Sequence, residues 1–475
     1  MPFDLIDRRQ LMATGAAGVA FSGLAAHARA QEAETYVNEV EGYGPLVKDP
    51  NGVLDLPAGF TYEVVSQAGD TMDDGLFMPG QPDGMGCFPL SDREVALVCN
   101  HELKGSGALH RNLGPGGFHQ ERLHLLTADR AYDTYKDGRV LPGGTTTTVY
   151  DLKTRKVIRR HLSLAGTSTN CCGGMTPWGS WLTCEETVET PADADVAKPH
   201  GFVFEVPATA PGLVDPVPLK AMGRFDHEAV CVDPRSGIVY LTEDQTDGLF
   251  YRFIPNVPGK LAEGGKLQAM VVRGATDTRN HDARTWAVGD WVQVDWIDME
   301  DVESPNGDLR KRGHAAGAVL VARGEGIWWG KDELYMTATT GGPLKRGQVL
   351  RYVPSPDEGK RGERRRPGRL QLFVESADEK TMNMADNITI APWGHLILCE
   401  DNYSETTRNH LKGVTPEGKV YTIARNVFRG NSEFAGACFA PDQTLFVNIM
   451  YPGLTLAIRG PWETVRAKAI APARC

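Results

Sequence analysis

The chain has 475 residues, with 50 Lys and Arg against 61 Asp and Glu, and a formal net charge of −11. Hydrophobic residues make up 41 % of it, enough to bury a core, which excludes disorder throughout. The acidic balance argues against a nucleic-acid-binding protein, which would usually carry a basic face, and suits a protein that gathers cations. The 53 Gly and 30 Pro predict many short strands, and nine cysteines are too few, and odd in number, for a disulfide framework.

Residues 1–30 have the pattern of a secretory signal. The paired Arg8 and Arg9 precede a weakly apolar run over 13–26, and Ala28-Arg29-Ala30 is a small-x-small cleavage pattern. The paired arginines favour the twin-arginine export route, so we expect that export machinery as a partner and a periplasmic or secreted bacterial protein. A surface helix that begins with two arginines is the alternative. No later segment has the ~18 consecutive apolar residues of a membrane span.

A strand–turn–strand pattern recurs along residues 31–475. A short strand-like run reaches a turn, and an apolar strand with a polar or acidic end follows. Six copies with variable insertions predict one all-β domain, a six-bladed β-propeller with long inserted loops over 104–142 and 255–319. A β-sandwich with coincidental turns is the alternative. The basic run at 360–369 is interpreted as a solvated loop. The turns lie at Pro89, Pro177, Pro234, Gly330, Pro392 and Pro441.

Reactive residues stand at equivalent positions of these copies. Five copies carry an acid or a cysteine five or six residues before the turn, and the last copy has the inert Ala435. Equivalent positions of propeller blades meet at the axis, so these side chains are expected to converge there. Carboxylates so close repel one another unless they are protonated or bind cations, which predicts a metal centre in the axial channel. The residues are Asp83, Cys171, Glu228, Glu325 and Asp386.

A second set of oxygen-bearing residues follows the other strand of several copies. Such carboxylates and amide carbonyls are the ligands that Ca²⁺ prefers, although strand-end acids facing water are the alternative. The set comprises Asn100-His101-Glu102, Glu185-Glu186, Glu243-Asp244, Glu400-Asp401-Asn402 and Asn448.

The cysteines differ in context. Cys171 and Cys172 lie in a glycine-flanked segment, where thiolate beside carboxylates favours a transition metal over calcium alone, with a vicinal disulfide as the alternative. Five others lie inside apolar runs and are expected to be packing residues: Cys99, Cys184, Cys231, Cys399 and Cys438. Arg323, beside Glu325, is a candidate anchor for a phosphate or carboxylate, or else a partner in an ordinary salt bridge.

At these residues the chain resembles the PhoX-type alkaline phosphatases, which are exported bacterial enzymes with a six-bladed propeller. The similarity covers most of the chain from about residue 50 onward, and its longest block is the most specific. The matching motifs are NHE (100–102), GTSTNCCGGMTPWGSWLTCEE (166–186), GRFDHE (223–228), VYLTED (239–244), RGEG (323–326), DN (386–387), PWG (392–394) and NIMYPG (448–453).

The resemblance implies an oxygen-bridged centre of about two ferric ions and two or three calcium ions. By motif position Cys171, Glu228, Glu325 and Asp386 resemble the iron ligands. Asn100, Glu102 and Asn387 resemble calcium-side or phosphate-side residues, and Arg323 resembles a phosphate contact. The chain departs from the family in being shorter than its longer members and in doubling the cysteine, so Cys171 is preferred over Cys172 as the ligand.

The predicted function is hydrolysis of small phosphomonoesters outside the cytoplasm by attack of a metal-bound oxygen, with Cys171, Glu228, Arg323, Glu325 and Asp386 as catalytic residues. No serine nucleophile motif is present to offer another route. The alternatives are a calcium-dependent propeller hydrolase of lactones or phosphodiesters and a non-catalytic propeller that binds a partner. We expect a monomer that binds no nucleic acid.

Overall fold

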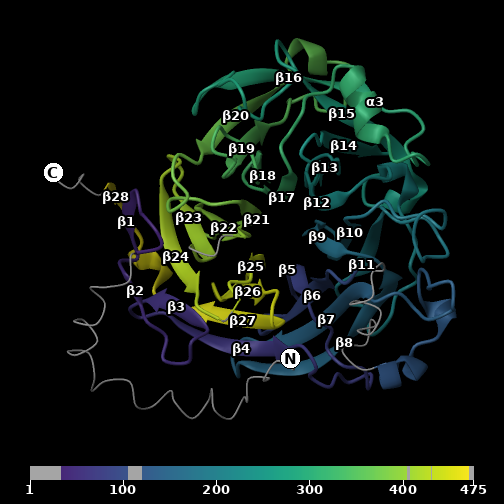
Figure 1. The fold of residues 1–475 in the computed structure, drawn as a ribbon, viewed down its shortest axis with the longest axis vertical. Coiled ribbons are helices and arrows are strands. Elements are labelled where there is room, and N and C mark those ends of the chain that lie inside the picture. Colours follow the sequence, from purple (N-terminus) through teal and green to yellow (C-terminus); the bar gives the residue numbers. More distant parts are fainter. Residues whose placement is uncertain (1–33, 105–119, 404–406, 429, 470–475) are drawn as a thin grey trace.

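A computed structural model of the chain describes residues 34–104, 120–403, 407–428 and 430–469 (Figure 1). The predicted signal at 1–30 and part of the predicted insertion at 104–142 lie outside these residues. No helix in the described ranges is long and apolar enough to cross a membrane.

The described chain is built almost entirely of antiparallel strands. One sheet contains β5 (Pro82–Pro89), β6 (Glu94–His101), β7 (Gly143–Asp151) and β8 (Lys156–Thr167), and a second contains β9 (Asn170–Met175), β10 (Ser180–Glu185) and β11 (Val203–Pro207). A nine-stranded sheet contains β12 (His227–Val232), β13 (Val239–Glu243), β14 (Phe250–Pro255), β15 (Gly265–Val272), β16 (Trp291–Asp298), β17 (Gly324–Trp329), β18 (Leu334–Ala338), β19 (Gln348–Val353) and β20 (Gly368–Glu375).

The remaining sheets join the two ends of the described chain. A six-stranded sheet contains β2 (Leu46–Val47), β3 (Leu54–Pro57), β21 (Ala385–Ile390), β22 (Leu396–Glu400), β23 (His410–Val414) and β24 (Val420–Asn426). A four-stranded sheet contains β4 (Thr61–Gln67), β25 (Phe434–Phe439), β26 (Leu445–Ile449) and β27 (Leu454–Arg459), and β1 (Val40–Gly42) pairs with β28 (Arg466–Ala469). Helical turns are short: α3 (Leu309–Ala315), η2 (Gln120–Leu125), η3 (Ala128–Arg130), η4 (Lys220–Met222), η5 (Leu261–Glu263), η6 (Glu363–Arg365) and η7 (Trp462–Thr464).

The sheets surround a common centre, as in a propeller, which confirms the predicted all-β class (Figure 1). Each sheet except the β1–β28 pair turns one or two strands toward that centre, and these inner strands contact one another in a closed ring: β5, β9, β12, β17, β21, β25 and β5 again. Each predicted turn connects an inner strand to the next strand of the chain, because its proline or glycine stops the first strand and permits the reversal.

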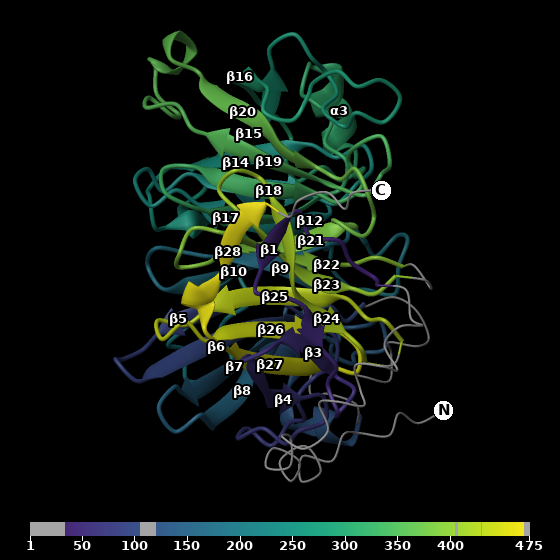
Figure 2. The same cartoon turned by 90° about the vertical axis from the view of Figure 1, so that its left-hand side faces the viewer.

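An early strand closes the ring. β4 pairs with β27 through partners such as Tyr62 with Ile458, and β3 pairs with β24. In Figure 2 these purple strands lie against the yellow ones near the other end of the chain. The apolar faces of the strands pack into buried clusters between neighbouring sheets, and one such cluster joins Leu54 and Phe60 to Leu445 and Leu456.

One detail differs from the sequence interpretation, and two others agree with it. The segment 255–319 is not one long loop, because it contains β15, β16 and α3. β15 completes the pairing of β14, and β16 pairs with both β15 and β20. The basic run at 360–369 does connect β19 to β20 and includes η6, with Lys360, Arg361, Arg364 and Arg366 exposed. The described cysteines are buried and form no disulfide, so Cys171 and Cys172 are not joined.

Candidate metal centre

The aligned reactive residues occupy one register position of the inner strands. Asp83, Cys171, Glu228, Glu325, Asp386 and Ala435 are the second residues of β5, β9, β12, β17, β21 and β25. Each side chain before Ala435 is 5 % exposed or less, except that of Asp386, which is partly buried. The sequence alignment therefore gives the same register as the structure.

Close packing of the inner strands explains why glycine follows this position in β5, β17 and β25. A Cβ added to Gly326 would lie 2.7 Å from the Asp386 carbonyl oxygen, and one added to Gly84 would lie 2.6 Å from Cys172 Cα. At Gly436 the added Cβ would lie 2.3 Å from the Asp83 carbonyl oxygen, and φ is +60°. Only glycine permits backbones to approach this closely, and that approach brings the second residues of neighbouring strands together.

Three groups of potential ligands form where these strands meet. In each group, one ligand atom from every residue lies within 4.8 Å of the others. Cys171, Glu186 and Glu228 form one group, and Glu228, Glu325 and Asp386 form a second that shares Glu228. The third combines Asp83, Glu102 and Glu433. The structure thus brings Cys171, Glu228, Glu325 and Asp386 into two adjoining groups and Glu102 into a third.

A repeated backbone hydrogen bond holds the second set of residues beside the first. The residue after the second strand of each unit donates its N–H to the carbonyl of the residue before the inner strand, with N···O distances of 2.9–3.4 Å. This bond fixes Glu102, Glu186, Asp244 and Asp401 at one end of the inner strands. The donor–acceptor pairs are Glu102–Gln81, Glu186–Thr169, Asp244–Asp226, Thr339–Arg323, Asp401–Met384 and Met450–Glu433.

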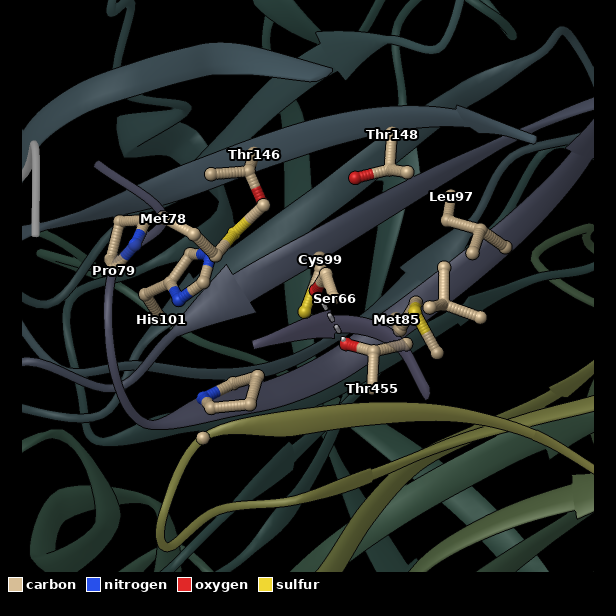
Figure 3. Close-up of a pocket in the computed structure, with 13 residues that line it drawn as sticks. Ser66, Met78, Pro79, Met85, Leu97, Cys99, His101, Thr146, Thr148 and Thr455 are labelled. Atoms are coloured by element: carbon tan, nitrogen blue, oxygen red, sulfur yellow. Dashed lines mark hydrogen bonds between the residues drawn. The ribbon is translucent and has the colours of Figure 1, made fainter. Parts of the chain in front are cut away.

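The residue immediately before Glu102, Glu186, Asp244 or Asp401 has a different role, because its side chain makes contacts within its own sheet. In β6 this residue is His101, which lies 2.9 Å from the Gly80 carbonyl and 2.9 Å from Thr146 Oγ1. It lines a small enclosed cavity with Cys99 and Thr148 (Figure 3). That cavity has room for about one water molecule, so it is no site for a phosphate ester.

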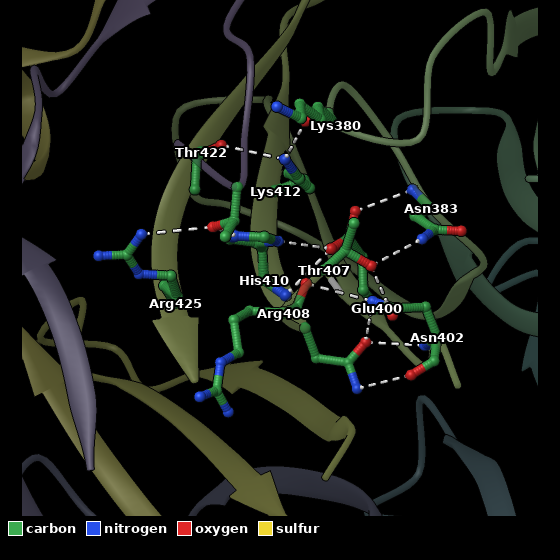
Figure 4. A network of polar contacts seen from close by, with 12 residues as sticks. Lys380, Asn383, Glu400, Asn402, Thr407, Arg408, His410, Lys412, Thr422 and Arg425 are labelled. Carbon is green, nitrogen blue, oxygen red and sulfur yellow. Dashed lines mark hydrogen bonds and ion pairs between the residues drawn. The ribbon is translucent and has the colours of Figure 1, made fainter. Parts of the chain in front are cut away.

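Glu185, Glu243 and Glu400 bind the backbone of their own sheets. Glu400 accepts hydrogen bonds from the N–H groups of Asn383 and His410 and from His410 Nδ1 (Figure 4). Glu185 accepts from three backbone N–H groups, and Glu243 accepts from Leu249 N–H and the Tyr251 hydroxyl. The predicted acid pairs therefore separate into a structural acid and a central acid.

Burial and mutual repulsion raise the pKa of the central acids. Burial raises the pKa of Asp386 and of Glu102 to about 7, with a further contribution from Asp401 in each case. The pKa values of Asp83, Glu186, Glu228, Glu325 and Glu433 also lie well above the ordinary value, from burial first and neighbouring carboxylates second. Burial and then Glu228 likewise raise the pKa of the Cys171 thiol. Asp83 Oδ1 is buried with no hydrogen-bond partner among the described residues.

This donor set fits metal cations. Carboxylates packed at this density are stabilised as anions only by positive charge, and a thiolate among them suits a transition metal. The thiol of Cys171 donates to Glu228 Oε2, so these two potential ligands lie in direct contact. The group of Asp83, Glu102 and Glu433 offers oxygen only, which suits calcium.

Arg323 lies beside the central acids and is salt-bridged, as the alternative sequence interpretation expected, whereas its role as an anchor for phosphate stays a prediction. Its Nε and Nη2 donate to Asp244 Oδ1 and Oδ2 at 2.8 and 2.9 Å, and Nη2 lies 2.6 Å from Glu325 Oε1. The charge of Glu325 raises the pKa of the Arg323 guanidinium despite its burial. Lys104 Nζ lies 3.6 Å from Glu102 Oε1 at the edge of the centre.

The two predicted asparagines have supporting contacts. Asn100 donates to the carbonyls of Cys171 and Cys172 at 3.1 and 2.6 Å and accepts from Trp181 Nε1 at 2.8 Å. Its side chain therefore lies behind Cys171 and holds that backbone. Asn387 donates to Asp386 Oδ1 at 2.6 Å and accepts from Gly436 N–H at 2.8 Å. Cys172 Sγ lies 3.5 Å from Asn387 Oδ1, outside the three groups.

Glu433 is the acid that sequence reasoning missed. It immediately precedes β25, whose aligned position holds the inert Ala435, so the alignment gave no reason to choose it. A weak signal exists two residues before the aligned position, where two of the other copies carry the charged residues Asp226 and Arg323. Asp83 and Glu186 stood in the aligned sets but were not among the residues chosen as ligands.

The family of the chain follows from sequence and fold together. The family model for alkaline phosphatase PhoX matches residues 41–453. The chain belongs to the PhoX alkaline phosphatase family. It is therefore a phosphatase by family. Among curated proteins, no sequence matches the chain.

One solved structure shows the same fold, and two others are similar to the chain at lower TM-scores. The PhoX of Pseudomonas fluorescens, in complex with the transition-state analogue vanadate, is similar over 90 % of this chain and 98 % of its own, with 18 % identity and a TM-score of 0.64. A periplasmic gluconolactonase of Pseudomonas aeruginosa is similar over 87 % and 95 %, with 14 % identity and a TM-score of 0.41. The soluble aldose sugar dehydrogenase of Escherichia coli is similar over 85 % and 100 %, with 13 % identity and a TM-score of 0.28.

Proposed function

We propose that this PhoX-family chain hydrolyses small phosphomonoesters outside the cytoplasm with a metal centre at its axis. The observation that carries the proposal is the convergence of Cys171 and seven carboxylates in three groups at the centre of the ring, two of which share Glu228. A water-exposed set of strand-end acids would not need this burial. A non-catalytic propeller would have no use for acids whose pKa values are so strongly raised.

The donor chemistry divides the centre between two kinds of metal. About two ferric ions would be held by the set that contains a thiolate, which comprises Cys171, Glu186, Glu228, Glu325 and Asp386. Asp83, Glu102 and Glu433, with Asn387 nearby, would hold calcium, because this set offers oxygen. When bound, the metals neutralise phosphoryl charge and lower the pKa of water, so that a nucleophile is available at neutral pH.

The chain's own residues would bind and orient the phosphate. The guanidinium of Arg323 would take phosphoryl oxygens, and its hydrogen bonds to Asp244 hold its plane fixed before the substrate arrives. Lys104, paired with Glu102 at the edge, adds a second positive charge. Burial of the acids keeps bulk water from screening these interactions.

Six blades are the most consistent count for the ring. The repeated hydrogen bond between the two sets of residues occurs six times, and six inner strands close the ring. The nine-stranded sheet then comprises two blades, β12–β15 and β17–β20, with β16 between them. The chain as exported would be this single domain, released from the signal at 1–30 and acting as a monomer.

Activity and metal content together test the proposal. Protein exported by its own type of host is assayed with p-nitrophenyl phosphate before and after chelation, and its iron and calcium are measured. Glu325→Ala and Cys171→Ala are expected to lose more than 99 % of turnover, whereas Cys231→Ala, a buried cysteine outside the centre, keeps it. Full turnover in either central variant contradicts the assignment. Calcium without iron favours the lactone or phosphodiester hydrolase.

A further inference from the structure

Two exposed tyrosines lie at the edge of the metal centre. Tyr403 is 72 % exposed, the largest fraction among the large apolar side chains of the described residues, and Tyr451 is 48 % exposed. Tyr403 follows β22 and Tyr451 follows β26, two strands whose ends meet the repeated hydrogen bonds of the centre. Both residues therefore lie close in the chain to the residues that surround the candidate metal centre.

Hydrogen bonds fix both tyrosines to the centre. The Tyr403 hydroxyl donates to Asp401 Oδ2 at 2.6 Å, so the phenol end is anchored while the ring stays in solvent. Tyr451 donates its backbone N–H to Ser432 Oγ at 2.8 Å, and the preceding Met450 is bonded to the Glu433 carbonyl.

We propose that Tyr403 and Tyr451 determine specificity by contacting the organic group of the ester, and that the preferred substrates carry a planar aromatic group, aryl or nucleoside, next to the phosphate. The inference rests on the proposed phosphatase function. The phosphate would bind near Arg323, and the organic group would then reach the two rings at the edge.

Physical chemistry favours this assignment over a purely structural one. The charges of the acidic centre do not attract the uncharged organic group of a phosphate ester, so that group must be bound by other contacts. A tyrosine ring supplies a large uncharged contact with few rotatable bonds, and stacking on it tolerates different planar groups. If the rings served only the fold, they would be buried among apolar neighbours, as Tyr421 and Tyr251 are.

Kinetics with two esters tests the inference. Phenyl phosphate and glycerol 2-phosphate are compared in the wild type, Tyr403→Ala, Tyr451→Ala and Tyr403→Phe. We expect KM for phenyl phosphate to rise about tenfold in each alanine variant with kcat unchanged, and KM for glycerol 2-phosphate to change less than twofold. Tyr403→Phe keeps the ring, and its KM for phenyl phosphate is expected to lie between that of the wild type and that of Tyr403→Ala. Trp178→Ala, an exposed aromatic residue at the β9–β10 turn, is the matched control.

Binding of uncleavable analogues gives a readout apart from turnover. Calorimetry with phenylphosphonate and methylphosphonate is expected to show about tenfold weaker binding of phenylphosphonate alone in the alanine variants. Equal effects on both ligands, or none on either, overturn the inference. If the wild type cleaves neither ester, the proposed function fails, whereas the calorimetric preference still decides whether the tyrosines bind the aromatic group.

Discussion

At the scale of single residues, the contacts and the backbone conformation of Arg323 fix its position beside the central acids. Arg323 is held by Asp244 on one side and Glu325 on the other, and its backbone φ of +51° is rare for a residue with a side chain. Gln81, Thr169 and Met384 occupy the same place before β5, β9 and β21 and share a positive φ. Strain of this kind persists only where the surroundings enforce it, and it marks the entry of four of the six inner strands.

Asp244→Asn tests whether Asp244 positions the guanidinium. The variant removes the charge from a bidentate ion pair, so Arg323 loses its fixed plane and phosphate binding weakens. We expect the inhibition constant of inorganic phosphate to rise about tenfold in steady-state assays. Asp247→Asn, which alters the more exposed pair with Arg310, is the control and is expected to change nothing. An unchanged or lower constant for Asp244→Asn would mean that Arg323 needs no such support.

Single substitutions also distinguish which of the two adjacent cysteines binds metal. Cys171 lies with Glu186 and Glu228, whereas Cys172 lies beside Asn387 Oδ1 outside the three groups. We expect Cys171→Ser to lose most of the bound iron and Cys172→Ser to retain it, as measured by elemental analysis and by the iron–thiolate absorption. Retention of iron in Cys171→Ser with loss in Cys172→Ser would reverse the assignment.

At the scale of strands, two similar hairpins use the same Glu–His pair with opposite effects on the histidine. His200 lies 2.6 Å from Glu185 and 3.1 Å from Asp133, and His410 lies 2.9 Å from Glu400 with Thr35 on its other nitrogen. Burial lowers the pKa of both rings. Two carboxylates overcome this at His200 and raise its pKa to about 9, whereas the pKa of His410 falls to about 4.

His200 therefore gives the fold a pH-dependent stability. Its pKa in the folded state exceeds the ordinary 6.5, so the contribution is complete below pH 6.5 and is lost as pH rises through about 9. The full effect is ~3 kcal/mol from the size of the shift. We expect the denaturant midpoint of the wild type to fall between pH 6 and 10 and that of His200→Gln to fall much less. His410→Gln should follow the wild type, and a pH-independent wild type would refute the argument.

The glycines of the inner strands allow a test of ring packing. Gly326→Ala places a Cβ 2.7 Å from backbone atoms of β21, which must shift by several tenths of an ångström. We expect a loss of about 1–3 kcal/mol in unfolding free energy, the usual cost of overpacking, together with lower metal content. Gly212→Ala, where nothing lies within 4 Å of the added Cβ, is the control and should have little effect on either quantity. Equal stability of the two variants would show that the ring is not tightly packed.

At the scale of the whole molecule, the sequence predicts the positions that recur in every copy of the strand pattern. It misses contacts that occur only once. The second residues of the inner strands could be aligned because a turn follows each at a nearly fixed distance. The separation of Glu185 from Glu186 could not, since adjacent acids look alike until the strand end fixes their directions. The Arg323–Asp244 pair and the closure by β4 join residues 79 and about 390 positions apart, and no local pattern records such contacts. Glu433 joins the third group from the position before β25, although the aligned position of its own copy holds Ala435.

The buried acids predict opposite pH responses for the metal-free and the metal-loaded protein. In the metal-free form Asp386 and Glu102 have pKa values of about 7, above the ordinary value, so the folded state binds protons more tightly than the unfolded one. Protonation between pH 8 and 5.5 therefore raises the stability of the metal-free form. In the loaded form protons compete with the cations for the same oxygens, so acidification lowers stability.

Thermal unfolding of dialysed, metal-free protein and of reloaded protein at pH 8 and 5.5 measures both responses. We expect Tm of the metal-free form to rise on acidification and Tm of the loaded form to fall, with the two forms furthest apart at pH 8. Asp386→Asn removes one titrating acid and is expected to flatten the metal-free response. A metal-free protein that is more stable at pH 8 than at pH 5.5 would mean that its central acids are not forced together by the fold, and the argument for a cation at the axis would fail with it.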